Sequence, residues 1–292
     1  MNNWIPDQFF RYRGVSSPHF EQELKELKNN KVWLGSIKTQ NDPFEGVLCI
    51  EETPEASFLQ QYEACRRYFE THFPDEQIFS NDISLEQARD CNSSARQFSS
   101  YVIQNVHIAC FSRSWSNTLM WGHYADQFSG LCLCFEHDWI FTPEDAAPLY
   151  PVQYWKERPP GYSGLDFLIS TTISNYVHLQ RKSGRTYKEQ TMQQLEEIAH
   201  EKLKLAATSK SYDWSYEEEF RLVSVREEPQ YLRVPLKLKG VIFGPKATTD
   251  TRNQVMEQLG AEYAYSDMKL EANSYSYERI AISANSAGTV LR

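Results

Sequence analysis

One stretch near the middle of the chain constrains the fold most strongly, because a helix pattern stands between two strand patterns. The segment VHIACFS (106–112) is apolar and β-branched, which predicts a buried strand. NTLMWGHYADQF (117–128) follows as a short helix, and GLCLCFEH (130–137) as a second strand, expected to lie beside the first. Cys132 and Cys134 alternate along that second strand, so both are expected to point into the core.

The remaining segments predict further strands and helices in an irregular order. Strand patterns occur at 9–15, 31–37, 150–155, 217–225, 232–247 and 279–285. Helix patterns occur at 16–30, 57–73, 84–90, 165–208 with a break near KSGRT, and 248–260. Because strands and helices do not alternate regularly, a doubly wound sheet is not favoured. We expect one α+β domain over residues 1–292, with a mixed or mostly antiparallel sheet and a helical insertion at about 55–105.

Composition excludes several functional classes. The net charge of −9 argues against a nucleic-acid-binding surface that is basic throughout. A local basic groove stays open, and the only short basic clusters are RRYF (66–69) and RKSGR (181–185). No apolar run approaches the roughly 20 residues of a membrane span, and the N-terminus lacks a secretory pattern. The six cysteines form no CxxC pair and no histidine stands at zinc spacing, so no metal is expected. The expected location is cytoplasmic, without a membrane partner.

Several catalytic motifs are absent from the sequence. It contains no GxGxxG after a strand, no phosphate-binding GxxxxGK[ST] loop and no HExxH. Ser112 and Ser114 precede His123, but no GxSxG elbow is present, which disfavours a serine hydrolase.

Two polar groups near the N-terminus are candidate binding elements. On a strand, Arg11 and Arg13 share a face about 6.5–7 Å apart along the backbone. Two guanidinium groups there could clamp a phosphate or carboxylate, or they could be solvated on an edge strand. In NDPFEG, Asn41 and Asp42 could cap the turn and Glu45 could bind backbone, or the segment could only shape a loop.

Two further groups lie in the middle and late parts of the chain. If 117–128 is helical, Trp121 and Tyr124 share a side, with His123 on the adjoining stripe. His123 is a candidate proton shuttle or a structural histidine. In WSYEEEFRLV, a strand would place Glu217, Glu219 and Arg221 on one face, either as a solvated charge ladder or as the lining of a polar groove.

These segments together resemble a known bacterial family. FRYRGV, KVWLGSIKTQNDPFEG, CFSRSWSNTLMWGHYADQFSGLCLCF, WSYEEEFRLV and GVIFGPKA stand in the order found in the domain of unknown function 2971 family. The resemblance extends over about 9–285 and supports a role for the polar groups named above. One position departs from it, because Phe128 stands where the family often has a histidine.

The order of segments also resembles ADP-ribosyltransferase-like folds, which implies NAD as a substrate. In such folds a first-strand basic residue holds phosphate or ribose, and a late glutamate stabilises an oxocarbenium-like transition state. This resemblance implies that Arg13 or Arg11 binds phosphate, that Ser36 or Ser112 shapes the pocket with Tyr124, and that Glu219 is the catalytic carboxylate. Together with the polar groups named above, the candidate catalytic residues are Glu219, His123 and Tyr124. The candidate ligand-binding residues are Arg11, Arg13, Ser36, Asn41, Asp42, Ser112, Trp121, Glu217 and Arg221. If this is correct, His123 or Tyr124 should approach both Arg13 and Glu219.

Three functions follow as expectations. The first is an ADP-ribosyltransferase or NAD-cleaving enzyme, acting in phage defence or as a toxin-like effector on an unspecified protein or nucleic-acid acceptor. The second is a non-catalytic module that binds or senses a nucleotide-like small molecule, with the same residues in a buried polar network. The third is a metal-dependent nuclease or hydrolase built from Asp42, Glu45 and His123.

Overall fold

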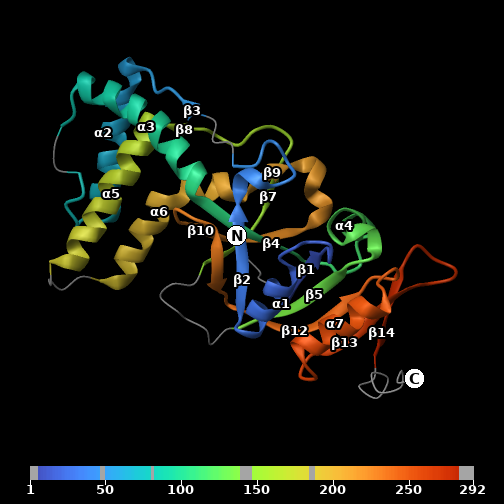
Figure 1. The fold of residues 1–292 in the computed structure, drawn as a ribbon. Coiled ribbons are helices and arrows are strands. Elements are labelled where there is room, and N and C mark those ends of the chain that lie inside the picture. Colours follow the sequence, from blue (N-terminus) through green and yellow to red (C-terminus); the bar gives the residue numbers. More distant parts are fainter. Residues whose placement is uncertain (1–5, 47–49, 80–81, 139–146, 184–187, 283–292) are drawn as a thin grey trace, which may run out of the picture. The chain divides into compact units, whose positions relative to one another are not determined.

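The computed structural model describes most of the chain (Figure 1), namely residues 6–46, 50–79, 82–138, 147–183 and 188–282. The chain forms two compact units that interleave along the sequence. The first unit comprises Met1–Ser36, His107–Tyr154 and Tyr212–Arg292. The second comprises Ile37–Val106 and Trp155–Ser211.

A ten-stranded sheet forms the centre of the first unit. Its strands are β1 (Gln8–Arg13), β2 (Lys31–Ser36), β4 (Val106–Ser112), β5 (Leu131–His137), β6 (Leu149–Pro151), β10 (Glu219–Val225), β11 (Gln230–Arg233), β12 (Leu236–Phe243), β13 (Ala264–Leu270) and β14 (Tyr277–Ala281). Eight strands follow the order β11-β2-β4-β1-β5-β12-β13-β14, and β10 pairs with β4 and β6. The β12–β13 pair is parallel and its neighbours are antiparallel, which confirms the predicted α+β class with a mostly antiparallel sheet.

Different helices pack against the two faces of this sheet. Helices α1 (Phe20–Lys28) and α7 (Thr249–Leu259) contribute to the same apolar cluster as Phe9 of β1. Helix α4 (Thr118–Tyr124) covers the opposite face, where Trp121 packs with Tyr12. Cys132 and Cys134 are buried in this second cluster, which confirms that both point into the core.

Helix α4 connects β4 to β5 across an intervening strand. The prediction that these two strands are neighbours is wrong, because β1 lies between them and is antiparallel to both. After α4 the chain passes through the short helix η2 (Asp126–Phe128), whose three residues all have positive φ. The helical spacing of α4 therefore ends before Gln127, and Gln127 does not lie on the side of the helix that carries His123. Gly130 ends this turn, and a side chain there would meet the Arg13 carbonyl oxygen at 2.3 Å.

Four helices form most of the second unit. They are α2 (Glu55–His72), α3 (Leu85–Asn105), α5 (Gly164–Lys182) and α6 (Glu189–Thr208), with η1 (Ile37–Thr39), the parallel pair β3 (Ile50–Glu51) and β8 (Tyr162–Ser163), and β9 (Ser209–Ser211). Figure 1 shows α3 beside α5. Residues such as Phe69, Ile173 and Leu195 form an apolar core between α2, α5 and α6. The expected helical insertion at 55–105 contains α2 and α3, and α5 and α6 join it from a later part of the sequence.

Local signals explain several of these boundaries. The predicted helix start at Ser84 is confirmed, since its hydroxyl accepts the Gln87 amide and the Gln87 side chain accepts the Ser84 amide. β10 begins at Glu219 rather than 217, because η3 (Tyr212–Glu217) and the positive φ of Glu218 precede it. β7 (Gln153–Trp155) and β6 share the predicted strand at 150–155, and β13 was not predicted.

Two predicted features lie partly outside the described residues. These are the helix break near KSGRT and the end of the last strand, at 184–187 and 283–285. None of the described helices combines the length and apolar character that crossing a bilayer requires.

Candidate functional site

The two arginines of β1 lie on the face of the sheet that α1 covers. Arg13 donates from Nε and Nη2 to Glu23 Oε2, at 2.9 and 2.5 Å. Arg11 donates to the Trp33 carbonyl oxygen at 3.3 Å and lies over the Phe111 ring. Burial lowers the pKa of Arg11 to about 10. Both side chains therefore contact the protein on the face opposite to Trp121.

Tyr124, Glu217 and Ser112 meet on the α4 face of the same unit. The Tyr124 hydroxyl donates to Glu217 Oε1 at 2.5 Å, and the Glu217 side chain is 2% exposed. The Ser112 hydroxyl donates to the Glu217 carbonyl oxygen at 2.7 Å and accepts the Ser114 amide. Asn117 begins α4 and donates to the Tyr216 carbonyl oxygen at 2.6 Å. These contacts hold η3 against α4, and we call Ser112, Tyr124, Glu217, Glu219 and Arg221 the polar network.

Glu219 and Arg221 form a buried ion pair within this network. Arg221 Nε and Nη2 donate to the two oxygens of Glu219 at 2.8 and 2.9 Å. Arg221 is 0% exposed and Glu219 is 4% exposed. Phe220 packs against Phe9, so strand alternation places the ion pair on the opposite side of β10. Glu217, Glu219 and Arg221 are therefore buried inside the protein, and they do not form a solvent-exposed ladder of charges.

The sheet separates the residues expected to form one NAD site. Arg13 lies on the α1 face, whereas Glu219 and Tyr124 lie on the α4 face. Trp121 is fully buried and donates from Nε1 to the Trp115 carbonyl oxygen at 2.7 Å. His123 is exposed, with its ring centroid 6.5 Å from that of Tyr216. His123 and Tyr124 therefore do not approach Arg13 as expected.

The other expected binding residues have mainly local contacts. Ser36 is half-buried at the end of β2, opposite His107 in the pairing with β4. Asn41 is exposed in the second unit. Asp42 is buried, and its side chain accepts the Phe44 amide at 2.9 Å, so it shapes the NDPFEG turn. Across the described part of the chain, no three His, Cys, Asp or Glu side chains are grouped as metal ligands.

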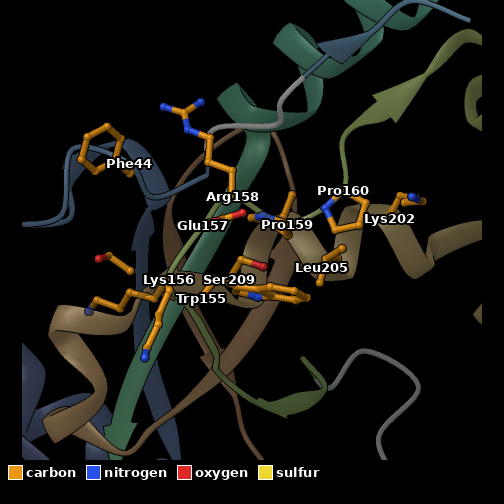
Figure 2. A pocket seen from close by; sticks show the side chains of 13 residues that line it. Phe44, Trp155, Lys156, Glu157, Arg158, Pro159, Pro160, Lys202, Leu205 and Ser209 are labelled. Carbon is orange, nitrogen blue, oxygen red and sulfur yellow. The ribbon is translucent and has the colours of Figure 1, made fainter.

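A basic pocket of about 210 Å³ lies entirely within the second unit (Figure 2). We call it the unit-2 pocket. Its wall comes from the loop after β7, the last turns of α6, β9 and the NDPFEG turn. Its cationic lining residues are Lys156, Arg158, Lys202 and Lys210, and its anionic one is Glu157. Such a wall favours an anionic ligand because guanidinium and ammonium groups bind phosphate and carboxylate oxygens.

Two of these cations are positioned by neighbouring groups of the second unit. Lys210 Nζ lies 3.0 Å from Glu45 Oε1, and both side chains are buried. This ion pair links β9 to the NDPFEG turn. The Arg158 guanidinium lies 5.4 Å from the Phe44 ring centroid, and Phe44 as a residue is 61% exposed. Arg158 and Phe44 thus form an exposed cation–π pair at the pocket.

None of the motifs singled out in the sequence predicted this pocket, although an aromatic residue and two cations stand close together in WKER (155–158). Aromatic residues next to basic ones are a usable signal for an anion-binding surface. Lys202 and Ser209 carry no comparable local signal, because only the packing of α6 brings them to the loop.

Comparison with known proteins gives one match. Residues 120–222 match the model of a family described as Protein of unknown function (DUF2971). No curated protein and no solved structure matches the chain. The matched segment contains most of α4, the polar network from Tyr124 onward and most of the unit-2 pocket. This match confirms, over residues 120–222, the resemblance to this family that was drawn from the sequence.

Proposed function

We propose that this protein binds a nucleotide-like anionic small molecule in the unit-2 pocket without transforming it. One observation carries the proposal: cationic side chains gather around a pocket in a chain whose net charge is −9. Acidic side chains dominate the whole sequence, so a local excess of cations marks a surface with a specific charge preference. The proposal corresponds to the second expectation from the sequence, at a different set of residues.

The exposed cations of the pocket support phosphate as the charged part of the ligand. Lys156 and Arg158 are exposed, whereas Lys210 is buried against Glu45. Anions reach the first two residues directly from solvent. The planar guanidinium of Arg158 suits two oxygens of one phosphate, and the ammonium of Lys156 adds a point charge.

The polar network supports a binding role rather than NAD cleavage. Both oxygens of Glu219 accept hydrogen bonds from Arg221, so the carboxylate expected to stabilise an oxocarbenium ion is held by an arginine. Arg13, expected to hold the NAD phosphates, is paired with Glu23 on the other face of the sheet. NAD cleavage stays a prediction, and the experiment below separates it from binding.

The first test is thermal unfolding of the full chain with AMP, GMP, CMP, UMP, NAD or inorganic phosphate. A ligand that binds only the folded state at 100 times its Kd stabilises that state by about 2.7 kcal/mol. We expect at least one nucleotide to raise the Tm of the wild type. Arg158→Glu should abolish this shift by reversing a pocket charge, whereas the matched variant Arg89→Glu reverses an exposed charge of α3 and should preserve it.

The second test is nicotinamide release from NAD by the wild type and by Glu219→Gln. The proposal predicts no release from either protein. Release by the wild type that disappears in a folded Glu219→Gln variant would contradict the non-catalytic role. An unchanged wild-type Tm with every nucleotide would contradict nucleotide binding itself.

A further inference from the structure

The NDPFEG turn at the unit-2 pocket reverses the usual order of burial. Its two acidic residues, Asp42 and Glu45, are buried, whereas Phe44 between them is mostly exposed to solvent. Folded proteins ordinarily bury phenylalanine and leave carboxylates in water, and a carboxylate is buried only where it has specific partners. The apolar ring of Phe44 is therefore open to another molecule at the pocket that it lines.

Contacts on both sides of Phe44 fix the turn that carries it. The Asp42 side chain accepts the Phe44 amide at 2.9 Å, and Lys210 Nζ lies 3.0 Å from Glu45 Oε1. Gly46 has a φ of 66°, and a side chain there would meet η1 at 2.9 Å, so the end of the turn also packs closely. The exposed ring thus stands on a backbone that is already held in place, which lowers the entropy cost of binding a ligand there.

The surface around the ring is cationic. Lys156 and Arg158 are the exposed cations among the described lining residues, and Glu157 supplies the only lining carboxylate in that set. Figure 2 shows the Arg158 side chain beside Phe44, and the guanidinium lies 5.4 Å from the centroid of the ring. An open aromatic face next to exposed cations suits a molecule that carries a flat ring and an anion together.

We infer that the unit-2 pocket binds a nucleoside monophosphate whose base stacks on Phe44 while its phosphate binds Arg158 and Lys156. This inference rests on the proposed function and makes it more specific. In the ligand-free protein Arg158 makes only an exposed cation–π contact, which is weak. Binding exchanges that contact for charge-assisted hydrogen bonds between the guanidinium and the phosphate, and the base covers the ring.

Stacking on Phe44 also determines what the pocket distinguishes. A phenyl ring has no hydrogen-bonding atom, so it stacks with the face of any base and does not read the edge of the base. The ring therefore selects molecules that contain a base over sugar phosphates that lack one. It contributes little to the choice among adenine, guanine, cytosine and uracil.

Calorimetric titration with AMP, GMP, CMP, UMP and ribose 5-phosphate tests this role of Phe44. Ribose 5-phosphate has the sugar and phosphate without the base, and should bind the wild type at least fivefold more weakly than the nucleotides do. Phe44→Leu keeps an apolar side chain but removes the aromatic face. It should weaken each nucleotide about fivefold or more and leave ribose 5-phosphate unchanged. Phe44→Trp offers a larger ring and should bind the nucleotides at least as tightly as the wild type.

The matched control is Tyr101→Leu, which removes an exposed aromatic ring from α3 and should bind every ligand as the wild type does. Equal nucleotide affinity of the wild type and Phe44→Leu would overturn the stacking role, while nucleotide binding would stand. Ribose 5-phosphate binding the wild type as tightly as the nucleotides, or a folded Phe44→Trp that binds them fivefold more weakly, would also overturn it. Absence of binding by every nucleotide to the wild type would overturn the proposed function as well.

Discussion

The polar network of the first unit and the unit-2 pocket differ in how their charged side chains are placed. In the network, the Tyr124 hydroxyl donates to Glu217 and the Arg221 guanidinium donates to Glu219, and these carboxylates and the arginine are buried. At the pocket, Lys156 and Arg158 are exposed to solvent. Buried polar groups that bond one another specify a fold, whereas exposed cations around a cavity favour an anionic ligand.

This difference changes which residues are functional candidates. The carboxylates and the arginine of the network form a charged motif in the sequence, yet their contacts are with one another. The pocket residues are less conspicuous, because their chemistry appears only when α6 and the loop after β7 come together. If this interpretation is correct, substitutions in the network change stability, and substitutions in the pocket change binding.

The largest expected effect is on the buried ion pair. Arg221→Met removes the cation and leaves the Glu219 carboxylate buried, which should lower the free energy of unfolding by about 3–5 kcal/mol. Urea denaturation followed by circular dichroism measures this loss. The double variant Glu219→Leu/Arg221→Met should recover much of it, because no buried charge remains. A loss below about 1 kcal/mol in Arg221→Met would mean that the pair is not structural.

A smaller loss is expected at Tyr124. Tyr124→Phe removes a hydroxyl that donates to the Glu217 carboxylate, and bonds to charged groups contribute about 1.5–3 kcal/mol. Urea denaturation should show this loss, while nucleotide binding should remain at the wild-type value. Loss of binding with unchanged stability would assign Tyr124 to a ligand site and would remove the contrast between the two regions.

Two serine substitutions compare the regions with the same chemical change. Ser112→Ala removes a hydroxyl that bonds the Glu217 carbonyl oxygen, and should destabilise the protein by about 1–3 kcal/mol. Ser209→Ala removes a buried hydroxyl without a protein partner, so the stability of the ligand-free protein should stay within about 0.5 kcal/mol or rise. Equal destabilisation by both variants in urea would show that Ser209 has a structural partner.

The smallest effect is expected at an exposed ion pair of the second unit. A hydrogen bond from Arg89 lowers the pKa of Glu55 below its ordinary value of 4.5. The stabilisation from this pair is therefore present above pH 4.5 and is lost as the pH falls through the lowered pKa. The Tm difference between the wild type and Arg89→Gln should be small at neutral pH and should vanish in acid. A difference that grows in acid would contradict the assigned direction of the pKa shift.

Much of the fold could be predicted from local patterns. The alternating segments that became β1, β2, β4 and β5 are short and bounded by turn residues, and Ser84 and Gln87 form the expected capping box. The neighbour relation of β4 and β5 could not be predicted, because strand order depends on contacts far apart in sequence. In the two basic clusters RRYF and RKSGR, Arg66 pairs with Glu63 and Asp82, and Arg181 pairs with Glu189 and Glu196.

The candidate site was predicted only in part. Of the residues named as site candidates, the structure brings Ser112, Tyr124 and Glu217 into one region. They did not show that Arg11 and Arg13 lie across the sheet from it, because the face of a strand depends on which helices cover the sheet. Nor did they show that Trp155 and Ser209, far apart in the sequence, line one pocket.

The central claim is that the unit-2 pocket, and not the polar network, binds the ligand. Calorimetric titration of the tightest-binding monophosphate into the wild type, Arg158→Glu and Tyr124→Phe tests it most directly. We predict saturable binding to the wild type and Tyr124→Phe, and none to Arg158→Glu. Binding that survives in Arg158→Glu but is lost in a folded Tyr124→Phe would contradict the claim and place the site in the first unit.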